Sequence, residues 1–275
     1  MNTKKIKKQL TVAASYPLST NMQRLEFTTD DMQYFSKDSA GQYVKLMFTP
    51  TGETDLELLN ADEPPVLRTY TLREIDVLNK RLTIDFVKHV GGVSNTSNYA
   101  VADLRVTAHS GGHGHYFAER AQVGDVIYIL GPGTLQSIDL NTDWVLLVAD
   151  MTAIPALSVV LEDLSADAQG YVVLEVTSNA DIPALTLPPK VVLTVCVRGQ
   201  AASLAETVKQ LSWLDGQPSV WCACEFSDMK AIRSYITHAH EVERAGCYFS
   251  SYWKEGVTED GHKIFKQQDN EALKA

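Results

Sequence analysis

The side chains best suited to binding a ligand are those of Arg68 and Tyr70, in the segment Arg68-Thr69-Tyr70-Thr71. An alternating run, Leu82 to Val87, follows, and Tyr70 alternates with polar neighbours as an aromatic residue on a half-buried strand does. Such a strand can hold a phenol ring against a flat ring system. The planar fork of an arginine can meet two oxygens of a diphosphate at once. The alternative is an ordinary strand with an arginine on its solvent face.

Further motifs follow in a fixed order along the chain. They are Asp85-Phe86-Val87-x-His89, Gly131-Pro132-Gly133, Asp150-x-Thr152-Ala153-x-Pro155 and Tyr252-Trp253-Lys254-x-Gly256. Together with Arg68-x-Tyr70-Thr71, their order and spacing resemble the siderophore-interacting protein family. This is a bacterial group of FAD-dependent ferric-siderophore reductases that is related to the ferredoxin-NADP reductases. The resemblance extends from about Leu10 to Lys263.

In that family, the Arg-x-Tyr-Thr strand and the strand after it bind FAD. The resemblance implies that Arg68 meets the pyrophosphate, that Tyr70 stacks on the isoalloxazine and that Thr71 reaches the polar edge of the ring. It assigns further cofactor contacts to Thr69, Asp85, Phe86, Val87 and His89. For His89 the alternative is a histidine that is satisfied by hydrogen bonds at the end of a strand.

The phosphate loop of the family, Gly-Pro-Ala-Ser-x-Trp-Ala, has its best counterpart in residues 112–118. Glycines let backbone N–H groups approach phosphates, and a helix that begins there favours anions at its N-terminus. His115 replaces the serine of the family, Phe117 replaces its tryptophan, and residues 93–110, roughly, are inserted before the loop. These departures leave the individual phosphate contacts open. The cofactor contacts expected here are Gly112, Gly114, His115, Tyr116, Phe117 and Ala118.

Three histidines near this loop, His109, His113 and His115, raise the question of a metal ion. Two histidines that are two residues apart can share a metal, but no carboxylate stands beside them at a familiar ligand spacing. The alternative is imidazoles that belong to the phosphate loop or face solvent. No metal site is predicted.

In the second half, Asp150-Met151-Thr152-Ala153-Ile154-Pro155 resembles the family's Gly-Asp-Glu-Thr-Ala-x-Pro. A turn from strand to helix at the carboxyl edge of a parallel sheet is where such folds bind dinucleotides. The alternative is a plain capping turn. The contacts with FAD or the nicotinamide cofactor expected in this half are Asp150, Thr152, Ala153, Pro155, Arg198, Glu225 and Trp253. Arg198 hints at NADPH, but one arginine cannot separate NADPH from NADH.

Lysines are expected to attract the substrate, because ferric siderophores are often anionic. Lys45 and Lys254 fall where the family has basic residues, and Lys263 and Arg120 are weaker candidates. Taken alone, each of the first two is a solvated surface lysine, and the substrate role is expected of Lys45 and Lys254 as a pair. In an acidic chain, the lysines would form a local positive island that draws in the chelate.

Composition excludes several classes of protein. The chain has 275 residues with 45% hydrophobic and 21% charged residues, which suits two globular domains. A net charge of −10 disfavours general nucleic-acid binding. Because no run of apolar residues is long enough for a membrane span or a signal peptide, we expect a cytoplasmic protein without membrane insertion. The four cysteines are then expected to be free thiols, with Cys222 and Cys224 in a core strand.

The chain divides into two parts that differ in their pattern of apolar and polar residues. Short alternating segments up to about Ser137 predict an antiparallel Greek-key barrel for FAD, in a domain of residues 1–140. From Trp144 onward, apolar strands alternate with helical segments, which predicts a parallel-sheet α/β domain for NAD(P)H in residues 141–275. One of these helices is expected at Asp228–Ala239, capped by Ser227.

The expected activity follows from the resemblance. NADPH or NADH reduces FAD, and the flavin passes single electrons to ferric siderophore, so that Fe²⁺ leaves the chelator. Ferredoxin is an alternative electron donor, and no side chain is assigned as a general acid or base. Three alternatives remain: a related flavoprotein with another electron acceptor, a non-enzymatic siderophore-binding protein, and a protein of this fold without flavin.

Overall fold

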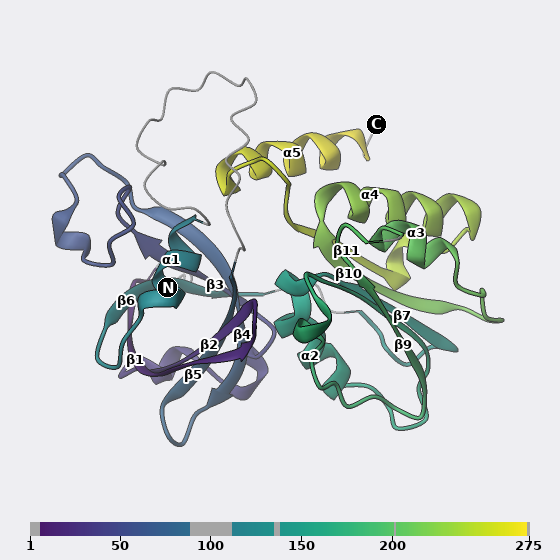
Figure 1. Cartoon of the computed structure of the whole chain (residues 1–275), viewed down its shortest axis with the longest axis horizontal. Coiled ribbons are helices and arrows are strands. Elements are labelled where there is room, and N and C mark those ends of the chain that lie inside the picture. The colour runs from purple at the N-terminus through teal and green to yellow at the C-terminus, as the bar shows by residue number, and fades with distance from the viewer. Residues whose placement is uncertain (1–5, 89–111, 135–137, 201, 274–275) are drawn as a thin grey trace. The chain divides into compact units, whose positions relative to one another are not determined.

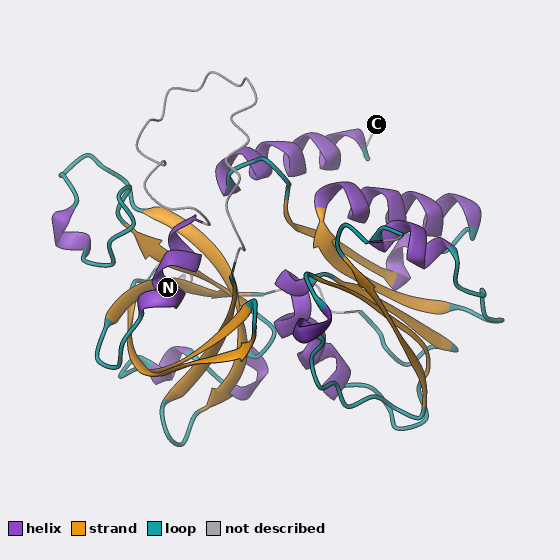
Figure 2. Ribbon diagram, viewed as in Figure 1, coloured by secondary structure: helices purple, strands orange, loops and turns teal. Residues whose placement is uncertain are grey.

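The computed structural model describes residues 6–88, 112–134, 138–200 and 202–273. The chain divides into two compact units, Met1–Leu135 and Gln136–Ala275. Figures 1 and 2 show that the first unit is built mainly of strands, whereas the second combines a sheet with helices. The predicted fold class, an antiparallel barrel followed by a parallel α/β sheet, is confirmed.

Six strands in the described part of the first unit close into a barrel in the order β1-β2-β5-β4-β3-β6. Side chains alternate between its interior and exterior, so Leu82, Ile84 and Phe86 are fully buried. Helix α1, Gly112–Arg120, packs on this core through Phe117, whose ring contacts Phe86 edge-on. The strands are β1 (Lys8–Ser19), β2 (Met22–Thr28), β3 (Tyr43–Phe48), β4 (Val66–Asp76), β5 (Arg81–Val87) and β6 (Val126–Gly133).

A buried lysine joins the first and last strands of the barrel. Lys8 is fully buried, and its Nζ donates a hydrogen bond of 2.5 Å to the carbonyl oxygen of Gly131. The ammonium also lies 4.8 Å from the ring centre of Tyr34, and burial lowers the pKa of Lys8. The segment Gly131-Pro132-Gly133 therefore ends β6 and helps to close the barrel.

The second unit is a parallel sheet in the order β11-β10-β7-β8-β9. Helices α3 and α4 cover one face through Leu204, Val208 and Ile232, while α2 lies on the other face, as Figure 2 shows. The elements are β7 (Trp144–Ala149), α2 (Ile154–Glu162), β8 (Gln169–Val176), β9 (Lys190–Val197), α3 (Leu204–Lys209), β10 (Pro218–Glu225), α4 (Phe226–Ser234), β11 (Cys247–Trp253) and α5 (Glu259–Ala272). No helix in the described ranges has the length and apolar character that crossing a membrane requires.

The expected cap of α4 is wrong. Ser227 lies inside the helix, and the Glu225 carboxylate caps it by accepting hydrogen bonds from the backbone N–H groups of Ser227 and Asp228. A carboxylate can cap a helix as a hydroxyl does, and its charge also favours the helix N-terminus. The helix is α-helical only to Ser234, and residues 235–239 continue it as a π-helical turn.

The cysteines are free thiols, as predicted. Cys222 and Cys224 are fully buried on one face of β10, with their sulfur atoms 3.8 Å apart. Burial raises the pKa of Cys196 and raises that of Cys247 to about 11, and the pKa of Cys224 is well above its usual range because of Cys222 and burial. The expectation that Cys222 and Cys224 are core residues is confirmed.

We expect acid to weaken the attachment of α5, because this helix carries the buried His262. Its ring is buried, it shares a hydrogen bond of 2.8 Å with Ser251 Oγ, and burial lowers its pKa to about 4. The unfolded chain therefore binds the proton first, near its ordinary pKa of 6.5. Stability that the neutral ring contributes is complete above about pH 6.5 and is lost as the pH falls toward about 4. Urea unfolding across this window should show the loss, and His262→Gln should flatten it. Equal pH profiles for the two proteins would contradict the assignment.

Candidate functional site

Strand β4 holds Arg68 and Tyr70 on one face, because side chains two residues apart on a strand point the same way. Both side chains are half-buried. The Tyr70 ring packs on Phe86, with 4.4 Å between the ring centres. Arg68 Nη1 donates to the carbonyl oxygen of Leu67 at 2.9 Å, which uses one of its five N–H groups. A rigid phenol and a guanidinium are thus presented side by side.

The first turn of α1 contacts the Tyr70 hydroxyl. A Cβ atom built on Gly114 would lie 1.9 Å from the Tyr70 oxygen, so only glycine permits this approach. Gly112, the first residue of the helix, has a φ of +83°, and its absent Cβ would meet open space. The backbone N–H groups of a first helical turn have no partners within the helix, and they attract anions. Together with Arg68, this turn fits a ligand that joins an aromatic ring to a diphosphate.

Other residues expected at the flavin have mixed surroundings. Thr69 is exposed and accepts a hydrogen bond of 3.0 Å from Lys45 Nζ, whereas Thr71 is buried. Asp85 is buried in a bidentate ion pair with Arg24, at 2.6 and 2.8 Å. Phe86 belongs to the barrel core behind Tyr70, and Val87 is half-buried at the end of β5. His89 lies outside the described residues.

The predicted phosphate loop is largely helical. His115 is buried, with Nε2 3.3 Å from a Glu119 carboxylate oxygen. Tyr116 is half-buried, with the Arg120 guanidinium 4.1 Å from its ring centre. The side chains of Phe117 and Ala118 pack into the barrel core, away from the first turn of α1. His109 lies outside the described ranges. Within those ranges, no group of three or more His, Cys, Asp or Glu side chains is placed to bind a metal ion.

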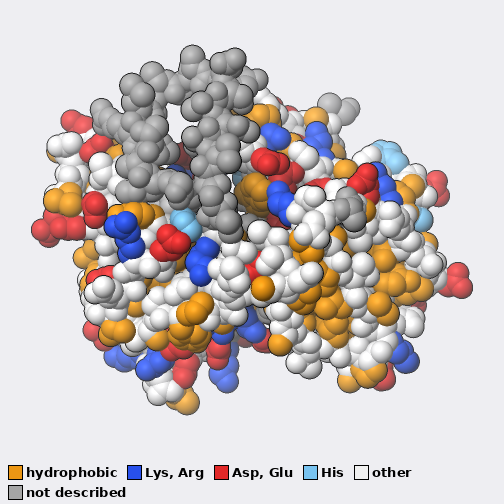
Figure 3. Space-filling view, in the orientation of Figure 1, with side chains coloured by type: hydrophobic (Ala, Val, Ile, Leu, Met, Phe, Trp, Pro, Cys, Tyr) orange, Lys and Arg blue, Asp and Glu red, His pale blue; other side chains and the backbone are white. Residues whose placement is uncertain are grey.

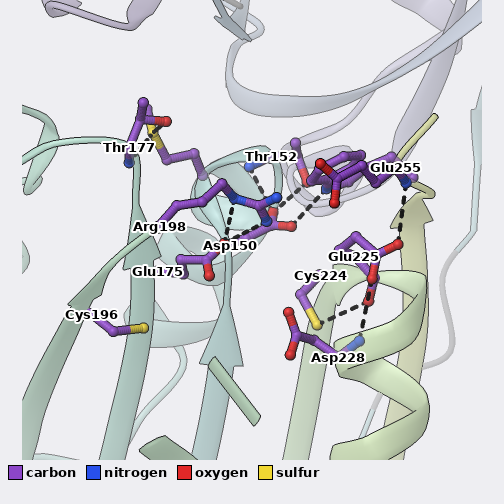
Figure 4. A network of polar contacts seen from close by, with 12 residues as sticks. Asp150, Thr152, Glu175, Thr177, Cys196, Arg198, Cys224, Glu225, Asp228 and Glu255 are labelled. Carbon is purple, nitrogen blue, oxygen red and sulfur yellow. Dashed lines mark hydrogen bonds and ion pairs between the residues drawn. The ribbon is translucent and has the colours of Figure 1, made fainter. Parts of the chain in front are cut away.

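In the second unit, predicted residues lie at the carboxyl edge of the sheet, among them Asp150, Thr152, Arg198 and Glu225 (Figure 4). Asp150 follows β7 and is only 3% exposed. Its carboxylate accepts hydrogen bonds from Thr152 N at 2.9 Å, Thr152 Oγ1 at 2.5 Å and Trp253 Nε1 at 2.7 Å. Burial raises the pKa of Asp150, while these donors oppose the rise. Ala153 and Pro155 are buried at the start of α2, where proline suits the first turn.

Arg198 extends from the end of β9 toward Asp150 (Figure 4). Its Nε and Nη2 donate to a Glu175 carboxylate oxygen at 2.8 and 2.5 Å, and its guanidinium carbon lies 4.8 Å from the Trp253 ring centre. Trp253 is therefore fixed at its edge by Asp150 and on its face by Arg198. Burial raises the pKa of Glu175, and Arg198 counteracts that rise.

Glu225 also holds the local backbone together. Besides capping α4, its Oε1 accepts a hydrogen bond of 3.2 Å from Glu255 N, in the turn after β11. This bond fixes the turn that carries Lys254. The Lys254 ammonium lies about equally far from two phenyl rings, Phe226 and Phe265.

Two cavities lie away from these side chains in the described part of the chain. One, of about 250 Å³, lies at the amino-terminal ends of β7 to β9 beside Asp143, Asp167 and Lys190. The other, of about 410 Å³, lies on the barrel beside Thr29 and Lys80. Nucleotides bind parallel sheets at the opposite, carboxyl edge, so the first cavity is not part of the site. The second cavity is lined by none of the predicted site residues.

Both halves of the chain match known protein families. Residues 11–136 match the siderophore-interacting FAD-binding domain, and residues 142–256 match the siderophore-interacting protein. The chain belongs to the siderophore-interacting protein family. The barrel unit is thus an FAD-binding domain of this family, as the sequence resemblance implied.

Several relatives are similar over most of their length. Ferric vibriobactin reductase ViuB of Vibrio cholerae is 29% identical, covering 89% of this chain and 88% of that protein. The uncharacterized protein Rv2895c of Mycobacterium tuberculosis is also 29% identical, covering 95% of both chains. Ferric acinetobactin reductase of Acinetobacter baumannii is 24% identical, covering 70% of this chain and 63% of that protein.

Solved structures support the same family. The siderophore-interacting protein SipS from Aeromonas hydrophila is 26% identical, with a TM-score of 0.77 over 94% of this chain and 98% of its own. The FAD/NAD-binding domain of nitric oxide dioxygenase from Vibrio cholerae is 13% identical, with a TM-score of 0.58 over 90% of this chain and 98% of its own. The second likeness concerns the fold alone.

Sequence reasoning missed two parts of this family member's site. Glu175 was not singled out, although it is the one carboxylate in the apolar strand run Tyr171–Val176, and a buried charge in such a run requires a partner. Phe226 and Phe265 gave no signal, because their proximity to Lys254 depends on how α4 and α5 pack.

Proposed function

We propose that this member of the family is a ferric-siderophore reductase that uses FAD and a reduced nicotinamide. The observation that carries the proposal is the meeting of Tyr70 with the first turn of α1, on the strand that also bears Arg68. This arrangement suits a flavin with a diphosphate. Two relatives are named ferric vibriobactin reductase and ferric acinetobactin reductase, and the first half of this chain matches an FAD-binding domain model.

The barrel residues would bind and orient the cofactor. Tyr70 would support the ring system, while Arg68 and the N–H groups of α1 would hold the diphosphate. When bound, FAD supplies a change from two-electron to one-electron chemistry, so that one hydride can serve two Fe³⁺ ions. Fe²⁺ binds hard oxygen ligands more weakly than Fe³⁺ does, so the iron leaves the chelator.

The second unit would bind the electron donor. Its carboxyl edge carries Asp150, Thr152 and a clamped Trp253, at the place where parallel sheets bind dinucleotides. Both NADH and NADPH are candidates, because Arg198 already pairs with Glu175 and is not a dedicated phosphate ligand. Ferredoxin is a further candidate donor, and cytoplasmic location stays a prediction.

The substrate would be a ferric siderophore, drawn in by local cations. On the face seen in Figure 3, basic side chains are interspersed with acidic ones and do not form one broad patch. In this proposal, Lys45 and Lys254 act as individual charges. Lys263 is the weaker candidate, because its Nζ pairs with Asp260 at 2.6 Å.

Anaerobic rapid mixing tests the proposal. Protein loaded with FAD is mixed with NADH or NADPH, and then with ferric chelates in the presence of an Fe²⁺-specific dye. We expect the flavin absorbance to bleach with a nicotinamide and to return with a chelate, as two Fe²⁺ appear per flavin. A flavin that bleaches but is not reoxidised by any chelate would indicate another acceptor. A protein that binds no FAD would refute the proposal.

A further inference from the structure

Two aromatic rings hold the Lys254 ammonium. Its Nζ lies 5.0 Å from the ring centre of Phe226, at the start of α4, and 4.9 Å from that of Phe265, on α5. The two rings are themselves 5.9 Å apart, with an angle of 59° between their planes. Both distances are within the range in which an ammonium is attracted to the face of a ring.

This arrangement fixes the ammonium without cancelling its charge. A carboxylate partner would neutralise the lysine, as Asp260 does for Lys263 at 2.6 Å. Among the ion pairs of the described residues, Lys254 forms none. Aromatic faces attract the cation through their quadrupole and carry no net charge. The full positive charge of Lys254 therefore stays available to an anion.

Helix α5 sets the position of Phe265. Asp269 forms a bidentate pair with Arg233 of α4, with both bonds at 2.8 Å. One turn before Phe265, His262 bonds to Ser251 of β11 at 2.8 Å. These contacts bracket Phe265, whose own side chain is 37% exposed. The helix is thus anchored on both sides of a ring that solvent reaches.

We propose that Phe265 is a positioning residue for substrate binding. With Phe226, it holds the Lys254 ammonium in one place, so that an anionic ferric chelate meets a preformed and uncancelled charge. This inference rests on the proposed function, in which Lys254 contacts the chelate. Without the Phe265 ring, the lysine keeps its charge but regains its freedom of rotation, and binding must order it again.

Two variants of the FAD-loaded protein distinguish the effect of the aromatic ring of Phe265 from the effect of its size. Phe265→Leu keeps an apolar side chain but loses the aromatic face, and Phe265→Tyr keeps the face. The probes are the ferric complex of a synthetic tris-catecholate, which is an anion, and a neutral ferric tris-hydroxamate. We expect Phe265→Leu to raise KM for the anionic probe by about three- to tenfold, with kcat and flavin reduction by the nicotinamide unchanged. Phe265→Tyr should match the wild type, and KM for the neutral probe should stay unchanged. Equal KM values for Phe265→Leu and wild type, or an equal loss in Phe265→Tyr, would overturn the proposal.

A spectroscopic measurement separates this inference from the proposed function. In the substrate-free protein, ring currents should shift the NMR signals of the Lys254 ε-methylene group, and Phe265→Leu should reduce the shift. Without such a shift, the positioning role of Phe265 would be refuted. Reduction of ferric chelates by the wild type would still support the proposed reductase function. If Lys254→Met leaves KM for the anionic probe unchanged, the role of Lys254 falls and the positioning role with it. If the wild type reduces no ferric chelate, the function falls and the positioning role has no basis.

Discussion

Replacing Gly114 with alanine should strip FAD from the barrel and destabilise it. The added methyl group would lie 1.9 Å from the Tyr70 hydroxyl oxygen and 2.7 Å from the carbon that bears it. Neither the helix nor the strand can yield easily, because α1 packs on the barrel core and Tyr70 packs on Phe86. Overpacking of this kind costs about 2–3 kcal/mol. The displaced Tyr70 or α1 would also disrupt the cofactor site, with at least about a tenfold loss of FAD affinity, or about 1.4 kcal/mol.

The measurements are FAD titration by flavin fluorescence and urea unfolding. Gly246→Ala is a matched control, because its added Cβ would meet only the carbonyl oxygen of Pro218 at 3.5 Å, an ordinary contact. The double variant Tyr70→Ala/Gly114→Ala removes the obstructing ring, so it should recover the stability lost to the clash but not the FAD affinity. A Gly114→Ala protein that is isolated with a full complement of FAD would show that the approach of α1 to Tyr70 is unimportant.

Asp150→Ala should produce a comparable loss in the second unit. The carboxylate accepts three hydrogen bonds, two from Thr152 and one from the Trp253 indole. Removing it leaves these donors without their acceptor in a buried region, at about 1–3 kcal/mol for each group that water cannot reach. We expect a loss of about 3 kcal/mol in total. Trp253 should also lose its orientation and nicotinamide-driven reduction of the flavin should slow, because the indole N–H would lose its acceptor while the Arg198 contact remains.

Asp150→Asn distinguishes the hydrogen bonds from the charge. Because burial raises the pKa of Asp150 in the folded protein, the folded state keeps this proton to higher pH than the unfolded chain does. The contribution of this group to stability is therefore greatest below the unfolded pKa and falls as the pH rises through the folded value. The amide side chain would keep one acceptor and have no proton to lose, so Asp150→Asn should unfold with a flatter dependence on pH. Urea unfolding at several pH values provides the measurement, and a slope as steep as that of the wild type would refute the assignment to Asp150.

The pattern of apolar residues predicted the barrel and the parallel sheet, because it reflects which side chains each strand buries. Strand β7 is the continuous apolar run Trp144–Ala149, and β3 is the alternating run Tyr43–Phe48, each in the half of the chain where its pattern predicts it. Helix α5 was not predicted, because Ile264 and Phe265 are the only large apolar residues in its segment, and its anchors are the buried His262 and Asp269. A helix held by buried polar contacts has few apolar residues, so its segment does not stand out as a core-facing helix.

Site residues that belong to a sequence motif were predicted. Residues that reach the site only through contacts between separate helices and strands were missed. Arg68, Tyr70 and Asp150 stood in motifs, and the structure gives each a defined environment. Their proposed contacts with FAD and nicotinamide stay predictions. Ser227 was wrongly assigned as a cap because the spacing of capping residues cannot show that the Glu225 side chain folds back onto its own helix. The pairing of Glu175 in β8 with Arg198, which follows β9, links residues far apart in the sequence and has no local signature.

The buried thiols give this protein a built-in reporter of its own unfolding. A thiol whose pKa lies well above neutrality is almost wholly protonated, and only the thiolate attacks alkylating reagents quickly. Cys224 and Cys247 meet both conditions of slow reaction, burial and a raised pKa. Rapid alkylation in a short pulse should therefore label Cys224 and Cys247 only in molecules that have opened, whereas Cys196 is only half-buried and is left out of the count. Counting labels at Cys224 and Cys247 by mass spectrometry would give the opened fraction of each variant above without any dependence on the colour of the flavin.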